Sequence, residues 1–191
     1  MIKVRIVMKY KGMLAACCMA LVCFSSTAQN SMPSVLAELK ALGFPDVRSE
    51  SFASTNENLS ITAIHPLKES AEEPRKGSLM YLVKVSPLPE GLLMLLAEFV
   101  PCKPGFTALD LTEIVIRVNG QKINAVRNCV AIEGKADTQF IYSAKNKSGN
   151  DFIIKQFREK EVVVVHLNSI PIPFKTEGFA EVAKKLGGKA L

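Results

Sequence analysis

Residues 113–132 read EIVIRVNGQKINAVRNCVAI, and this stretch decides the fold. Ile114, Ile116 and Val118 recur at every second position, which is the period of a half-buried β-strand. Asn119-Gly120 then supplies the dipeptide that best adopts positive φ in a tight hairpin, and residues 122–132 follow as the return strand. The stretch therefore predicts an antiparallel hairpin, from which the rest of the sheet can be built outward.

Further strands are predicted on both sides of this hairpin, at residues 59–64, 79–85, 92–100, 138–144, 161–167 and 170–174. The run 92–100, LLMLLAEFV, favours a helix by propensity, but the prolines that flank it favour a short buried strand. The run 161–167, EVVVVHL, is apolar on both faces and predicts a central, covered strand. The alternating prolines of 170–174 predict an exposed edge strand.

Helices are predicted near both ends of the chain, at residues 31–43 and 176–186, from apolar residues at helical spacing. Residues 151–160, DFIIKQFREK, fit a strand or a helix, and an acid at the start with bases near the end favours the helix. Residues 47–57 predict a loop running into a strand. Together these elements predict an α+β fold: mainly an antiparallel β-sandwich-like sheet with short N- and C-terminal helices, in a single β-rich domain over residues 29–191.

Residues 1–28 have the three parts of a secretory signal peptide. Four basic residues precede residue 12, the uncharged apolar run 13–24 follows, and Ala28 ends a motif of small residues. The apolar run is too short to span a bilayer as a helix. We expect cleavage near Ala28, a bacterial periplasmic or secreted mature chain, and no transmembrane segment in it. Lipidation at Cys17, in the sequence LAAC (14–17), is the alternative.

Most of the formal charge of +6 on the 191 residues comes from this leader. Residues 1–28 hold four of the 24 basic side chains and no acid, so 20 basic and 18 acidic side chains remain. The mature chain thus lacks the basic excess that is typical of nucleic-acid-binding proteins. We expect no nucleic-acid partner.

Cys102 and Cys129 are the two cysteines that remain after cleavage. An even number of cysteines in an oxidising compartment predicts one disulfide, and we expect it to join neighbouring strands. Two buried free thiols are the alternative. Neither cysteine belongs to a C-x-x-C motif, and no Cys/His cluster has the spacing of metal ligands. We therefore expect neither a redox-active pair nor a metal site.

Few residues suit catalysis. The two histidines, His65 and His166, are the available bases for a nucleophilic triad, and each lies at a predicted strand end. No G-x-S-x-G motif and no glycine-rich phosphate loop occurs. We expect no catalytic residue and no cofactor, and a hydrolase that uses His65 or His166 stays open as an alternative.

A local basic cluster lies between residues 145 and 160, formed by Lys145, Lys147, Lys155 and Arg158. Nearby acids such as Asp151 make a solvated face one interpretation. The other is a contact surface for an acidic partner, together with the edge near residues 170–174. This cluster is the candidate partner-binding site of the chain.

The motifs IRVNGQKI (116–123) and VRNC (126–129), then FIIKQF (152–157) before a Val-rich strand, and finally IPFKTEGFAEVAKKL (172–186) follow in order. This order resembles the invasion-associated locus B family of secreted bacterial proteins. The resemblance implies an exported β-sandwich with envelope or host-contact roles, and it carries over no site residue.

From residues and resemblance together, we expect an exported non-enzymatic binding or envelope-associated protein. Its partner would be another protein or an envelope component. An inhibitor or immunity-type protein of a secreted enzyme is the alternative within the same class.

Overall fold

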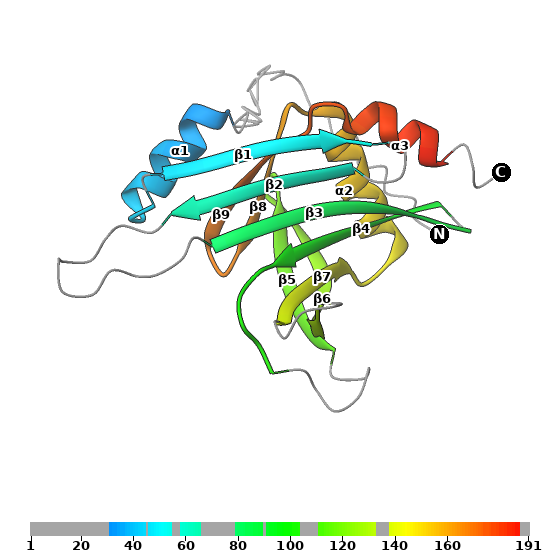
Figure 1. Cartoon of the computed structure of the whole chain (residues 1–191), viewed down its shortest axis with the longest axis horizontal. Helices are drawn as coiled ribbons and strands as arrows, with labels where there is room; N and C mark the ends of the chain where they lie inside the picture. Colours follow the sequence, from blue (N-terminus) through cyan, green and yellow to red (C-terminus); the bar gives the residue numbers. More distant parts are fainter. Residues whose placement is uncertain are drawn as a thin grey trace, which may run out of the picture.

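The computed structural model describes residues 31–44, 46–54, 58–65, 79–89, 91–103, 111–132 and 138–187. These ranges contain three helices: α1 (Met32–Ala41), α2 (Lys147–Glu159) and α3 (Phe179–Gly187). They also contain nine strands: β1 (Asp46–Ala53), β2 (Asn58–His65), β3 (Leu79–Leu88), β4 (Gly91–Glu98), β5 (Thr112–Val118), β6 (Gln121–Ala131), β7 (Thr138–Ala144), β8 (Val162–Leu167) and β9 (Ile170–Lys175) (Figure 1). The predicted leader, residues 1–28, lies outside the described residues.

The nine described strands form one antiparallel sheet in the order β1-β2-β3-β4-β7-β6-β5-β8-β9. The sheet curves until β9 lies against β1 and β2, which gives a nearly closed, barrel-like architecture (Figure 1). The predicted α+β class is confirmed, but the predicted sandwich is wrong. Alternation along a strand tells which face is buried. It does not tell whether the two halves of the sheet join edge to edge. Here they do, because β4 pairs with β7 through Leu96–Glu98 and Phe140–Tyr142.

Hydroxyl groups close the gap between β9 and the first two strands. Prolines in β9 lack the N–H group that a regular ladder would need at this edge. Instead, Thr62 donates a hydrogen bond to the carbonyl oxygen of Pro173. Ser60 donates to the carbonyl oxygen of Lys175 at 2.5 Å, and the Lys175 N–H donates to Ser49 Oγ at 2.9 Å. β9 is the terminal strand as predicted, but its edge is covered and not exposed.

The core fills the concave face of the sheet, where α2 and α3 pack against each other and against β4. Phe157 of α2 lies beside Phe174 of β9 and Phe179 of α3, with ring centroids 6.1 Å and 5.3 Å apart. Ile153 and Ile154 are buried on the same helix. The apolar stripe of residues 151–160 therefore forms a helix, as its charge pattern favours.

The local predictions hold in most segments. Asn119 and Gly120 have φ angles of 47° and 84°, the positive values that the hairpin turn between β5 and β6 requires. Residues 92–100 form a strand over most of their length, as the flanking prolines favour. The prediction for residues 47–57 is corrected, because β1 begins at Asp46 and pairs with β2 along its full length. β1 is rich in polar residues because it lies beside β9, where serine and threonine hydroxyl groups close the gap in the sheet.

Candidate functional site

The predicted basic cluster borders a groove of about 230 Å³ at the point where β7 passes into α2. Its apolar wall comes from the β3–β4 hairpin and the end of β7, and its polar wall comes from the start of α2. The lining residues are Leu88, Leu92, Leu93, Ala144, Lys145, Asn146, Lys147, Asn150 and Asp151. We refer to this hollow as the groove.

The turn that carries the lysines is fixed by its own sequence. Asn146 caps α2, since its Oδ1 accepts from the Gly149 N–H at 2.8 Å and from Ser148 Oγ at 2.9 Å. A side chain at position 149 would be crowded, because a Cβ there would lie 3.0 Å from Ile123 Cγ2. The Lys145 N–H donates to the carbonyl oxygen of Asn124 at 2.9 Å. The turn therefore presents Lys145 and Lys147 on a rigid backbone.

Asn150 forms the floor of the groove and connects α2 to β4. Its Nδ2 donates to the Leu92 carbonyl oxygen at 2.7 Å, and its Oδ1 accepts from the Met94 N–H at 2.9 Å. β4 pairs with β7 only over Leu96–Glu98, so the Asn150 amide satisfies backbone groups that the ladder leaves open. The sequence analysis missed this residue, because a single polar residue in an amphipathic segment carries no signal of such a contact.

Both lysines of the turn are paired with exposed acids. Lys145 Nζ contacts Glu113 of β5, and Lys147 Nζ lies 2.5 Å from Asp151 Oδ2 one helical turn further on. The side chains are 48% and 68% exposed in the first pair and 70% and 53% exposed in the second. Ion pairs this exposed contribute between about 0 and 1 kcal/mol, so their carboxylates can be exchanged at small cost.

Lys155 and Arg158 are exposed on α2 and continue the stripe that begins at Lys147 and Asp151. The structure therefore brings three members of the predicted cluster onto one side of α2 and places Lys145 beside its start. The cluster and the groove form a continuous surface with apolar and basic parts.

His166, the histidine whose side chain the structure describes, does not line the groove. His166 of β8 has its Nε2 4.0 Å from Glu38 Oε1 of α1. Its Nδ1 is buried and has no hydrogen-bond partner. His65 is the last residue of β2, and its side chain lies outside the described part of the structure. His166 therefore stands next to an acid, and no hydrogen bond joins its Nδ1 to a nucleophile.

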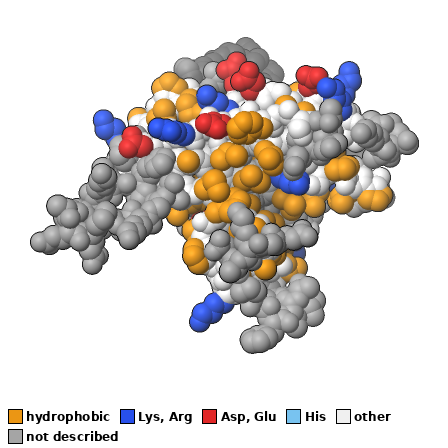
Figure 2. Space-filling model, in the orientation of Figure 1, with side chains coloured by type: hydrophobic (Ala, Val, Ile, Leu, Met, Phe, Trp, Pro, Cys, Tyr) orange, Lys and Arg blue, Asp and Glu red, His pale blue; other side chains and the backbone are white. Residues whose placement is uncertain are grey.

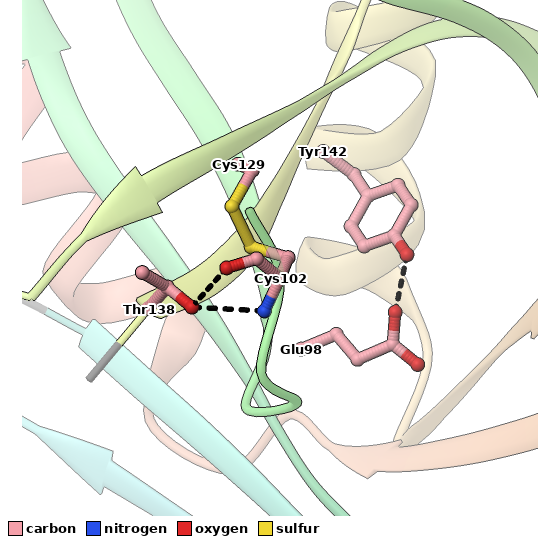
Figure 3. The surroundings of a disulfide bond; sticks show 5 residues. All are labelled: Glu98, Cys102, Cys129, Thr138 and Tyr142. Atoms are coloured by element: carbon pink, nitrogen blue, oxygen red, sulfur yellow. Dashed lines mark hydrogen bonds between the residues drawn. A yellow bond between two sulfur atoms is a disulfide. The ribbon is translucent and has the colours of Figure 1, made fainter. Parts of the chain in front are cut away.

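Cys102 and Cys129 form a disulfide (Figure 3). Cys129 belongs to β6, whereas Cys102 follows β4, and β7 lies between these two strands. Thr138 of β7 holds the bridge in place, since its hydroxyl accepts from the Cys102 N–H at 2.8 Å and donates to the Cys102 carbonyl oxygen at 2.7 Å. The pairing is confirmed, but the expectation that it joins neighbouring strands is wrong.

A carboxylate with two tyrosines lies on the inner face near the disulfide. Tyr142 donates to Glu98 Oε2 (Figure 3). Tyr81 donates to Glu98 Oε1 at 3.2 Å. Burial, followed by the nearby Glu98 carboxylate, raises the pKa of both tyrosines well above the usual range. Both hydroxyls stay protonated at neutral pH, so the cluster joins β3, β4 and β7 without supplying a nucleophile.

Among the described residues, no group of three or more His, Cys, Asp and Glu side chains is arranged to hold a metal ion. None of the helices in the described ranges is long and apolar enough to cross a membrane.

Comparison with protein-family models, with curated proteins and with solved structures finds no match to this chain. The resemblance to the invasion-associated locus B family therefore rests on the sequence motifs alone and stays a prediction.

Proposed function

We propose that the chain is an exported, non-enzymatic binding protein that holds an acidic segment of a partner protein in the groove. The observation that carries the proposal is the position of Lys145 and Lys147. Both side chains line a hollow whose opposite wall is formed by leucines. A groove with an apolar wall and cationic rim is complementary to a peptide that alternates acidic and apolar side chains.

The two lysines can bind such a partner because their ion pairs within the chain are exposed and weak. Glu113 and Asp151 are exposed and pair with Lys145 and Lys147 beside the groove. A carboxylate of the partner can replace Glu113 or Asp151 in the ion pair with a lysine. The displaced acid loses little interaction energy, because its ion pair is exposed to solvent. Lys155 and Arg158 extend the positive surface and would steer the acidic segment toward the groove.

The apolar wall supplies the part of the affinity that does not depend on salt. Leu88, Leu92 and Leu93 line the groove together. Burying one leucine-sized side chain of the partner against them would contribute about 1.5 to 3 kcal/mol. A volume of about 230 Å³ accommodates one or two side chains and is smaller than the cavities that enclose drug-sized ligands.

Export is supported by two separate features. The first 28 residues have the pattern of a signal peptide. The Cys102–Cys129 disulfide suits an oxidising compartment such as the periplasm. Within this class, an inhibitor or immunity-type role means that the acidic segment belongs to a secreted enzyme.

The proposal is tested by affinity capture from a periplasmic extract with wild type and with a Lys145→Glu/Lys147→Glu/Lys155→Glu variant. Lys40→Glu/Lys175→Glu/Lys184→Glu is the matched control, because it makes the same charge change at exposed lysines on α1, β9 and the surface of α3. We expect one salt-sensitive partner, lost only in the first variant. Identical partner profiles for all three proteins would show that the basic cluster is a solvated surface.

A further inference from the structure

The outer face of β2–β4 is largely apolar, although no described element covers it, and β1 borders it with charged side chains. In β2 the polar side chains point inward and the apolar side chains point outward, which is the reverse of the pattern in a sheet with one solvated face. Asn58, Ser60 and Thr62 are buried at 1%, 3% and 0% exposure, while Leu59 and Ile61 face outward and are only half-buried. The polar residues are inside because two of them satisfy the edge of β9. The apolar residues are therefore on the outside.

This outward apolar face continues across the neighbouring strands by register. Ile61 pairs with Leu82 of β3, Leu82 pairs with Ala97 of β4, and Ala97 pairs with Ile141 of β7. The adjacent row contains Ala63 and Met80. Figure 2 shows the hydrophobic side chains gathered over the middle strands of this face, with charged side chains along the β1 side. Strands that are apolar on both faces are normally covered on both faces.

The size of the face fits a weak protein interface. Four strands about 4.8 Å apart, each contributing roughly seven residues at 3.3 Å, give a face of about 19 by 23 Å, or about 440 Å². Two such faces bury about 900 Å², the size range of weak, transient associations. Contiguous apolar patches of this size on a monomer usually bind a partner.

The rim on β1 indicates which partner fits. Arg48 and Glu50 are exposed, lie on the outer face and pair with Ala63 and Ile61 of β2. Across the strands, one row contains Arg48, Ala63 and Met80, and the next row contains Glu50, Ile61 and Leu82. A two-fold axis that runs parallel to these rows and between them would place Arg48 of one copy opposite Glu50 of the other. The same axis would place Ala63 opposite Ile61 and Met80 opposite Leu82, small against large and apolar against apolar. Lys84, the cation within the face, already has a partner within the chain.

We propose that this outer face binds a second copy of the same chain, with Arg48 of each copy opposite Glu50 of the other. The result is two sheets packed face to face. The paired rows that meet at this axis lie on β1–β4 and contain none of the residues that line the groove, so the proposal does not depend on the proposed partner groove.

The test is sedimentation velocity of the purified protein from about 1 to 500 µM, a range that spans the affinity expected for an interface at the small end of the size scale. Wild type should show a reversible monomer–dimer equilibrium. Leu82→Glu should stay monomeric, with circular dichroism showing an intact fold, because it places two buried charges in the interface. Val115→Glu, at an exposed position of β5, is the control and should dimerise as wild type does.

Charge exchange tests the orientation. Arg48→Glu and Glu50→Arg should each weaken dimerisation about tenfold, because each places like charges opposite one another twice. The double variant Arg48→Glu/Glu50→Arg should restore dimerisation to within about threefold of wild type. Wild type that is monomeric throughout, a dimer unaffected by Leu82→Glu, or a double variant no better than the single ones would each overturn the proposal. Loss of a different captured protein in Leu82→Glu, with no wild-type dimer, would assign the face to that protein instead.

Discussion

The hydroxyl of Thr62 in β2 donates a hydrogen bond to the carbonyl oxygen of Pro173 in β9, although no β-ladder joins these two strands. Ser60 makes the same kind of contact with Lys175. Side chains thus replace a missing strand partner, and the nearly closed sheet depends on buried hydroxyl groups at this point.

Replacing Thr62 by valine should lower the free energy of unfolding by about 1 to 3 kcal/mol, because the buried Pro173 carbonyl loses its donor while the shape of the side chain is kept. Urea unfolding followed by circular dichroism measures the change. Thr112→Val, at an exposed position of β5, is the control and should stay within about 0.5 kcal/mol of wild type. Equal stabilities for Thr62→Val and Thr112→Val would mean that the hydroxyl does not hold β9.

Asn150→Ala should lower the free energy of unfolding by about 2 kcal/mol, because it removes two hydrogen bonds to the backbone of β4. Asn124→Ala, whose side chain is exposed on β6, provides the comparison and should be nearly neutral. Hydrogen exchange should also become faster at Met94 in the Asn150 variant. Unchanged protection at that amide would contradict the role of Asn150 as a substitute strand partner.

The double variant Cys102→Ala/Cys129→Ala should be less stable than the oxidised protein by about 3 to 4 kcal/mol, since the disulfide closes a loop with a sequence separation of 27 residues. Chemical unfolding of the two proteins measures the difference. The reduced wild-type protein should behave like the double variant. If thiol reagents label both cysteines of the native exported protein without a reductant, the disulfide is absent from it.

Alkaline pH should destabilise the fold through Tyr81 and Tyr142. Their pKa values are raised in the folded protein, so the unfolded chain releases these protons first, near its pKa of about 10. The stabilisation is complete below about pH 10 and is lost as the pH rises further. Tyr10, the remaining tyrosine, precedes the predicted cleavage site. In the processed protein, tyrosinate absorbance near 295 nm should therefore appear together with unfolding and not before it.

Phenylalanine variants separate the two tyrosines. Tyr142→Phe should remove part of the alkaline loss of stability and should leave Glu98 with one hydroxyl donor. Tyrosinate absorbance that rises near pH 10 in a fully folded protein would show that these hydroxyls are accessible to solvent.

The parts of the fold that depend on neighbouring residues could be predicted from the sequence. Asn119-Gly120 predicts its hairpin because two positive φ angles in succession admit few residue types. The helix predicted over residues 151–160 follows from its apolar stripe and its charges, but its first turn, from Lys147 to Asn150, was not predicted. The disulfide follows from the number of cysteines, but its position does not. Sequence alone cannot tell that β7 inserts between β4 and β6.

The parts that depend on distant contacts could not be predicted. Alternation in β2 would turn Leu59 and Ile61 inward, yet the buried edge of β9 requires Ser60 and Thr62 on that side. The basic residues at the groove were visible as charges. The floor of the groove could not be predicted, because Asn150 and the leucines of the β3–β4 hairpin meet only in the folded chain.

Site-specific photo-cross-linking in the cells that produce the chain tests most directly whether the groove holds a partner. A benzophenone amino acid at Leu88, which lines the groove, is compared with the same residue at Ala180, which is exposed on α3. We expect a protein adduct at position 88 that disappears when Lys145 and Lys147 are changed to glutamate, and no adduct at position 180. Adducts of equal yield at both positions, or an adduct at position 88 that survives the charge reversal, would contradict binding of an acidic partner in the groove.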